Sequence, residues 1–496
     1  MIRLGMTGNA NRAETCRQVL LFLAIIFLAG CGTKPAPQPV PAPFTESPAE
    51  PDPVPIVDQP DMEPVEEIIP PVQIVYRPND TRPDHDDARA KELGIERYES
   101  RRLVLYSDLP PETARTLPPL VDALYPHWTE YFGELPPDRE GKDYQLTGYV
   151  IVEADRFRAA GMLPDELPVF AHGRHRGREF WLFNQEFPYY REHLVLHEAT
   201  HCYMTTMPGP LAGYWYMEGM AEYFALHAHS ANSELSFSAI PDDPAIVRGF
   251  GALHLIQQEL DADQAKTVKQ VMQLGQQEFA QNPTLPYAWS WWLCHFLSQH
   301  PSYSEDFRKL GQHLGSQQFF TEAENLYADQ LPLLEAEWSL ATHDLSYGFD
   351  VGQFAIGYHT AESLTPGTHR LAEVHADSSW QCTQVAVQEG DRLRITASGR
   401  VVLATVPRPW ESEAQGISIK YASGKPIGRL LGVVLPSVGK DGKPLTRVDH
   451  PEILDIGPDT TVNMPASGTL YLRVNDLWSE RRDNSGSYQI EISTGK

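Results

Sequence analysis

Two histidines one helical turn apart could bind a metal ion in the stretch HLVLHEATHCY, residues 193–203. Residues four apart in an α-helix lie on the same face, about 6 Å apart along the axis. His197 and His201 can therefore both reach one zinc ion through ring nitrogens, at about 2.0–2.1 Å. Glu198 lies beside that face, where its carboxylate can accept a proton from a water activated by the metal. The spacing predicts a zinc site with its own general base.

A second predicted helix supplies a third ligand. The segment YWYMEGMAEYFALH, residues 214–227, follows a PGPLAG loop that could reverse the chain and bring Glu218 beside His201. One oxygen ligand with two imidazoles leaves the fourth zinc position open, as a catalytic zinc requires. Glu222, one turn further along, is placed to accept a hydrogen bond from a ligand imidazole and fix its orientation.

Two alternative ligand sets remain open. His193 also lies four residues before His197, although no glutamate follows it directly as the motif requires. Glu222 could take the place of Glu218 as the oxygen ligand. A metal-free domain of the same fold is the alternative for the whole site.

The order H-E-x-x-H followed by W-x-x-E-G-x-A-E-Y resembles that of the gluzincin metallopeptidases. It is most similar to the peptidase-MA-like family of secreted bacterial proteins, over residues 98–345. The resemblance implies a zincin-like fold, a peptide or protein substrate, zinc as cofactor and a set of roles in this chain. His197, His201 and Glu218 would bind zinc, Glu198 would be the general base, and Glu222 would orient a ligand.

Tyr287, in the segment PTLPYAWSWW, is a further catalytic candidate. Its position is similar to that of a tyrosine in the aminopeptidase-like branch of the gluzincins. A phenol there could donate a hydrogen bond to the oxyanion that develops in the reaction. The alternative is a core tyrosine, since the whole segment is aromatic.

An α+β domain at residues 95–347 is expected to hold these residues, with a small sheet first and helices after it. The strand-like segments are RRLVLYSDLP, YQLTGYVIV and REFWLFNQ, and the helix-like ones include PPETARTLPPLVDALYPHWTEYFG and EADRFRAAG. His172 and His175, in AHGRHRG, are predicted to be polar loop residues without a function.

An all-β domain is expected at residues 370–496, as a β-sandwich or jelly roll. Apolar and polar residues alternate in TQVAVQEGDRLRITASGRVVLATV, GTLYLRVND and GSYQIEIS, with Gly and Asp turns between the segments. Short alternating strands between turns are typical of both folds.

A calcium site is predicted in YLRVNDLWSERRDNSGSYQIEI, because Asp476, Asp483 and Asn484 offer hard oxygens from one loop. The motif resembles the galactophilic PA-I-type lectins, jelly rolls in which calcium bridges protein and sugar, over residues 372–495. The resemblance implies that these three residues bind calcium together with the carbonyl of Glu480. Residues 420–432 have neither the His nor the Gln with which that family holds galactose. An Asx-rich turn without metal is the alternative.

The first 31 residues are predicted to be a signal sequence. Three arginines precede the apolar run VLLFLAIIFLAGC, which is too short to span a membrane comfortably. The ending LAGC resembles a bacterial lipobox, which implies cleavage before Cys31 and lipidation of its thiol; an uncleaved anchor is the alternative. Residues 32–90 begin as a proline-rich segment and are expected to form a disordered linker.

The net charge of −26 argues against nucleic acid as a partner, because a phosphate backbone needs a Lys and Arg surface. The sequence therefore predicts a lipid-anchored, extracytoplasmic zinc metallopeptidase of a bacterial cell envelope, with a C-terminal calcium- and carbohydrate-binding module. The alternative is a non-enzymatic surface lipoprotein that binds glycans or cell-wall polysaccharide through that module.

Overall fold

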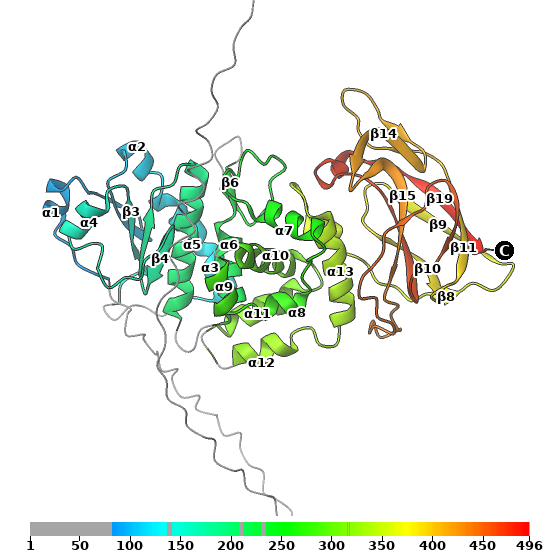
Figure 1. The fold of residues 1–496 in the computed structure, drawn as a ribbon, viewed down its shortest axis with the longest axis horizontal. Helices are drawn as coiled ribbons and strands as arrows, with labels where there is room; N and C mark the ends of the chain where they lie inside the picture. Colours follow the sequence, from blue (N-terminus) through cyan, green and yellow to red (C-terminus); the bar gives the residue numbers. More distant parts are fainter. Residues whose placement is uncertain are drawn as a thin grey trace, which may run out of the picture. The chain divides into compact units, whose positions relative to one another are not determined.

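An α+β part is followed along the chain by a part built mainly of β-strands (Figure 1). The computed structural model describes residues 82–135, 141–207, 212–229, 235–282, 284–314, 316 and 318–495. All of these residues belong to one compact unit. The predicted signal sequence, Cys31 and the linker before residue 82 lie outside the described residues. No helix within the described ranges is both long and apolar enough to cross a membrane.

The first part combines seven described strands with fourteen described helices. Its strands are β1 (Glu96–Glu99), β2 (Leu103–Ser107), β3 (Leu146–Ile151), β4 (Gly173–Arg176), β5 (Glu179–Phe183), β6 (His227–His229) and β7 (Leu235–Phe237). Its helices are α1 (Asp87–Glu92), α2 (Pro111–Ala114), α3 (Pro118–Phe132), α4 (Ala154–Ala159), α5 (Pro188–Thr206), α6 (Tyr214–Ala225), α7 (Ala252–Asp261), α8 (Val268–Met272), α9 (Gln276–Gln281), α10 (Leu285–Gln299), α11 (Ser304–Gln312), α12 (Gln318–Asn325), α13 (Leu331–Asp344) and α14 (Val351–Phe354).

Strands β1 to β5 form one sheet in the order β1-β2-β3-β5-β4. The β2–β3 and β3–β5 pairs are parallel, and the outer strands pair antiparallel. Alternate side chains of β2 enter two different cores: Leu103 and Leu105 enter the larger one, and Val104 and Tyr106 the smaller. A strand covered on both faces is apolar at every position, which explains the run LVLY.

The predicted strands of this part are confirmed as β2, β3 and β5. The predicted end of the linker at residue 90 is wrong, because α1 begins at Asp87. The Asp86 side chain caps α1 by accepting a hydrogen bond from the Arg89 backbone N–H, and Ala90 is buried. A short, highly charged helix that buries one alanine has no apolar stripe by which the sequence could reveal it.

The second part consists of two six-stranded sheets. The strands are β8 (Glu362–Ser363), β9 (His369–His375), β10 (Gln381–Val387), β11 (Arg392–Ser398), β12 (Val401–Val402), β13 (Glu411–Ser412), β14 (Gln415–Ala422), β15 (Lys425–Leu435), β16 (Leu454–Asp455), β17 (Asp459–Asn463), β18 (Gly468–Val474) and β19 (Ser485–Thr494). One sheet has the order β14-β15-β18-β10-β8 with β16 on β15, and the other β13-β12-β19-β11-β17 with β9 on β19. Side chains from both sheets share one apolar core, so the β-rich prediction is confirmed.

Strand β18 is buried on both faces and connects the two parts. Leu470, Leu472 and Val474 enter the core between the sheets, whereas Tyr471 joins the core that also contains the helices. Arg473 on that second face makes a buried ion pair with Asp344, the last residue of α13.

Removing the carboxylate of this pair should strongly destabilise the protein. Asp344→Ala leaves the Arg473 guanidinium buried without a counter-charge, and we expect the free energy of unfolding to fall by about 3–5 kcal/mol. Thermal or urea unfolding measures the change. Asp459→Ala, which breaks the exposed pair with Arg394, is the control and should leave stability nearly unchanged. An equal effect of both substitutions would contradict the role of the buried pair.

Candidate metal centre

Helix α5 carries three buried histidines on one face. His193, His197 and His201 are four residues apart, so their rings follow one another along the helix. The helix begins at Pro188, which suits a first helical turn because its missing N–H would be unpaired there anyway. The imidazoles of His197 and His201 meet nearly edge to face, with ring centroids 4.7 Å apart.

Helix α6 brings two glutamates to this face. Glu218 and Glu222 are also four residues apart, and α6 packs between α5 and α10. Gly219 explains how closely α6 and α10 approach, because a Cβ atom there would lie 2.4 Å from the Ser290 carbonyl oxygen of α10. The glycine that follows Glu218 therefore has a packing role.

Three donor atoms converge at the predicted zinc site. His201 Nε2 lies 3.0 Å from Glu218 Oε2, His197 Nε2 lies 3.6 Å from the same oxygen, and the two Nε2 atoms are 3.2 Å apart. Atoms bound to a tetrahedral zinc at about 2.0–2.1 Å are about 3.3 Å from one another. The set of two imidazoles and one carboxylate therefore fits a zinc ion in both chemistry and spacing.

The Glu218 carboxyl is held in its charged form. Burial alone would raise its pKa, but the charge of His201 and hydrogen bonds from both imidazoles lower it well below the usual range. Glu218 is therefore an anionic oxygen donor at neutral pH, as a metal ligand must be.

Glu222 lies behind the ligands, where it can orient them. Its Oε2 forms a hydrogen bond with His193 Nε2 at 2.9 Å, and its Oε1 lies 3.1 Å from His197 Nδ1. His193, His197 and Glu222 also form a group of potential ligands. In that group, however, the two imidazoles approach different carboxylate oxygens, as hydrogen-bond donors do.

Glu198 projects from α5 towards the edge strand β4. Its side chain is 7% exposed, and its Oε2 lies 3.4 Å from His175 Nδ1. Gly173 of β4 leaves the space that this carboxylate fills, because a Cβ atom at Gly173 would lie 2.3 Å from Glu198 Oε1. The candidate base is thus enclosed by the backbone of the edge strand.

The prediction that His175 is a loop residue is wrong. It lies in β4, and its ring stacks on that of His201 with centroids 4.5 Å apart. Burial and the neighbouring His201 lower the pKa of His175. A hairpin signal could have revealed the strand, since only Gly177 and Arg178 separate β4 from β5 and Gly177 has a φ of 59°.

An alanine at Gly173 should displace Glu198 without touching the predicted metal ligands. For the hydrolytic site that the sequence predicts, with Glu198 as its base, we expect Gly173→Ala to lower the rate by about 10²-fold, since a shift near 1 Å of a catalytic group costs that much. Zinc content, measured by elemental analysis, should stay the same. Gly251→Ala is the control, because no atom lies within 4 Å of an added Cβ there. An unaltered rate in Gly173→Ala would mean that Glu198 does not need this exact position.

Tyr287 lines the same cavity as the predicted ligands, and its ring centroid lies 6.3 Å from that of His197. Burial raises the pKa of its phenol, and the carboxylates of Glu218, Glu222 and Glu198 raise it further. The phenol therefore keeps its proton at neutral pH and can act as a hydrogen-bond donor.

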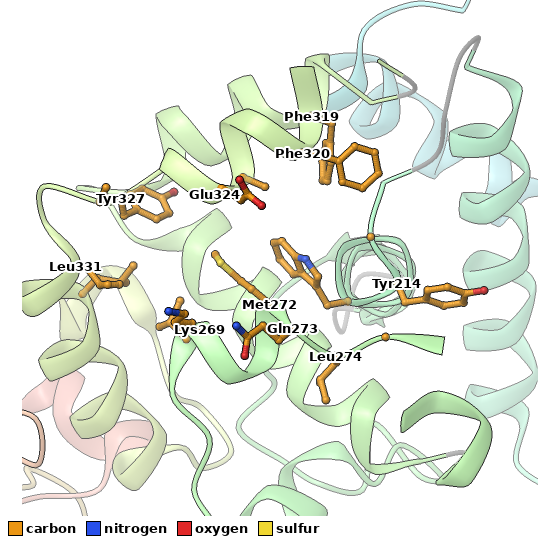
Figure 2. A pocket seen from close by; sticks show the side chains of 17 residues that line it. Tyr214, Lys269, Met272, Gln273, Leu274, Phe319, Phe320, Glu324, Tyr327 and Leu331 are labelled. Carbon is orange, nitrogen blue, oxygen red and sulfur yellow. The ribbon is translucent and has the colours of Figure 1, made fainter. Parts of the chain in front are cut away.

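The cavity at the site has a volume of about 550 Å³ and is partly open to solvent. A second cavity of about 730 Å³ lies among α6, α8, α12 and α13, and its lining is largely apolar. Tyr214 lines both cavities. Figure 2 shows the second one, with Tyr214 at one end and Lys269 and Leu331 at the other. A cavity of this size and composition suits the apolar portion of a small molecule or peptide.

Two of the predicted calcium ligands of the second part, Asp476 and Asn484, are in direct contact. Asp476 and Asn484 are buried, and the Asn484 amide donates to Asp476 Oδ2 at 2.9 Å, while Asn484 Oδ1 has no partner among the described residues. Burial raises the pKa of Asp476. The Asp483 carboxylate accepts hydrogen bonds from the backbone and hydroxyl of Thr405. The Glu480 side chain pairs with Lys420, which leaves the predicted role of its backbone carbonyl untested.

Comparison with known proteins identifies no family. No family model and no curated protein matches the chain. Among solved structures, the chain is similar to the EclA N-terminal domain, a PllA-like lectin, with 20% identity and a TM-score of 0.19 over 25% of this chain and 95% of that one. It is also similar to a functionally unknown conserved protein from Bacillus anthracis str. Ames, with 12% identity and a TM-score of 0.15 over 26% of this chain and 22% of that one. With TM-scores below 0.5, neither likeness identifies a fold.

Proposed function

We propose that the chain is a zinc-dependent hydrolase of peptide bonds with a zincin-like, gluzincin-type centre. The convergence of His197, His201 and Glu218 donor atoms beside the enclosed carboxylate of Glu198 carries the proposal. Zinc, when bound there, would polarise the scissile carbonyl and lower the pKa of a water towards about 7.

The other groups of the site supply proton transfer and orientation. Glu198 accepts a proton from the attacking water and passes it to the leaving amine. The Tyr287 phenol donates a hydrogen bond to the carbonyl oxygen as negative charge develops on it. Strand β4 is an edge strand, so a peptide can pair with its free backbone groups beside Glu198. Glu222 is hydrogen-bonded to His193 and lies 3.1 Å from His197 Nδ1, where it can orient that imidazole.

Elemental analysis combined with a peptide assay tests the proposal. The purified full chain should contain zinc and cleave a mixed peptide library, a chelator should abolish cleavage, and added zinc should restore it. A chain that contains no zinc after purification and takes up none on titration would overturn the proposal. From the sequence, we also propose that Cys31 carries lipid and that the enzyme works outside the cytoplasm.

A second candidate function is glycan binding by the C-terminal part, through calcium. The unpartnered Asn484 Oδ1 next to the buried Asp476 carboxylate favours a cation at this loop. Glycan-array binding with and without calcium tests this candidate. Calcium-dependent binding by a chain that holds no zinc would make it the main function.

A further inference from the structure

A second group of metal-ligating side chains lies outside the site described above. It consists of Glu192 on α5 and of His227 and His229 on β6, which follows α6 directly. Alternate residues of a strand point to the same side, so both imidazoles face α5. All three donor atoms lie within 4.8 Å of one another.

The distances match those of the first site. His227 Nε2 lies 3.2 Å from Glu192 Oε2, and His229 Nε2 lies 3.7 Å from the same oxygen. The corresponding imidazole–carboxylate distances to Glu218 are 3.0 and 3.6 Å. Both sets therefore approach the separation of about 3.3 Å expected between ligands of a tetrahedral zinc.

The hydrogen bonding of His227 favours a cation at this place. Its Nδ1 lies 2.8 Å from the Ala225 carbonyl oxygen, which can only accept, so Nδ1 carries the proton. In the neutral ring, Nε2 then directs a lone pair at the carboxylate of Glu192. The lone pair and the negatively charged carboxylate repel one another, and a cation bound by both would replace this repulsion with two bonds. In metal sites, the other nitrogen of a metal-bound imidazole usually donates to a carboxylate or a backbone carbonyl, as His227 Nδ1 does here.

The surroundings hold His227 rigidly and leave the site accessible. Its side chain is fully buried, and its ring stacks on Tyr189 with centroids 4.6 Å apart and planes 13° from parallel. The His229 side chain is half exposed, and that of Glu192 is 20% exposed. An ion can therefore enter from solvent and keep water in its remaining position.

We propose that Glu192, His227 and His229 form a second site for a divalent transition metal, with zinc as the expected ion, which fastens β6 to α5. Two imidazoles with one carboxylate suit zinc, whereas calcium and magnesium prefer oxygen donors alone. The alternative is an ion pair between doubly protonated His227 and Glu192 without metal.

Zinc stoichiometry of the full chain tests this proposal. The purified chain, stripped with chelator and then saturated with zinc and dialysed, should hold two zinc ions. Glu192→Gln and His229→Ala should each hold one and should lose part of the zinc-dependent rise in melting temperature. His229 is exposed enough that its removal should leave the fold intact, which circular dichroism checks. His450→Ala, an exposed loop histidine, is the matched control and should hold two.

The result also separates this site from the first one. His201→Ala should hold a single zinc ion, and His201→Ala combined with Glu192→Gln should hold none. If His201→Ala changes nothing while Glu192→Gln removes one ion, the second site stands and the proposed hydrolytic centre fails. Two outcomes would overturn the second site. In the first, both Glu192→Gln and His229→Ala still hold two zinc ions. In the second, the unaltered chain and both variants each hold only one.

Discussion

Replacing Glu198 with glutamine should leave zinc bound and lower the rate of peptide hydrolysis by about 10²- to 10⁴-fold. Glutamine has nearly the same shape as glutamate and fills the space beside Gly173, but its amide cannot accept a proton. Among the described residues, Glu198 belongs to no group of potential metal ligands, so its loss should not release the ion.

Rate and metal content must be measured together on this variant. Elemental analysis should give the same zinc content as the unaltered chain, and kcat should carry most of the loss. Glu186→Gln, on the exposed turn before α5, removes the same charge away from the cavity and should change neither quantity. Loss of zinc from Glu198→Gln would mean that Glu198 is a ligand and not the base.

Replacing Glu218 should release the metal, whereas replacing Glu222 should only weaken its binding. Glu218 Oε2 lies 3.6 Å from His197 Nε2 and 3.0 Å from His201 Nε2. Glu218→Gln removes the anionic ligand, so we expect a loss of zinc affinity well beyond the effect of Glu222→Gln. Removal of an orienting group such as Glu222 typically costs about 10- to 100-fold in metal affinity.

Competition with a chelator of known affinity measures both variants on one scale. Glu218 and Glu222 are partly buried carboxylates four residues apart on α6, and each substitution removes one charge, so the two variants control for one another. A larger loss in Glu222→Gln than in Glu218→Gln would exchange the two roles. That result would also restore His193 and His197 as the ligand pair, since both lie beside Glu222.

Much of the first site could be predicted because its geometry is local. His197, Glu198 and His201 share one helix, and Glu218 and Glu222 share the next, so helical spacing alone places each set on one face. The close approach of α6 to α10 depends on Gly219, which leaves room for the backbone of α10, and no spacing rule contains that contact. The sequence motif predicted that Glu218 lies beside the two histidines, but it did not predict the helix packing around α6.

Other features of the structure could not be read from local sequence patterns. His175 lies on an edge strand whose side chains are partly exposed, so no apolar run marks it as a strand. His227 and His229 meet Glu192 only because β6 returns along α5. The Asp483 carboxylate accepts hydrogen bonds from Thr405, 78 positions away. Contacts between segments that are distant in the sequence decide the cases of His227 and His229 and of Asp483, and local patterns do not contain such contacts.

The burial of β18 on both faces limits how the protein can be divided for study. A fragment that begins after α14 would expose Tyr471 and Trp478 to water, together with Arg473 stripped of Asp344. Such a fragment would tend to self-associate through that exposed surface, and any ligand binding measured on it would then reflect clustering as much as recognition. Ligand binding by the β-rich second part is therefore best measured on the full chain.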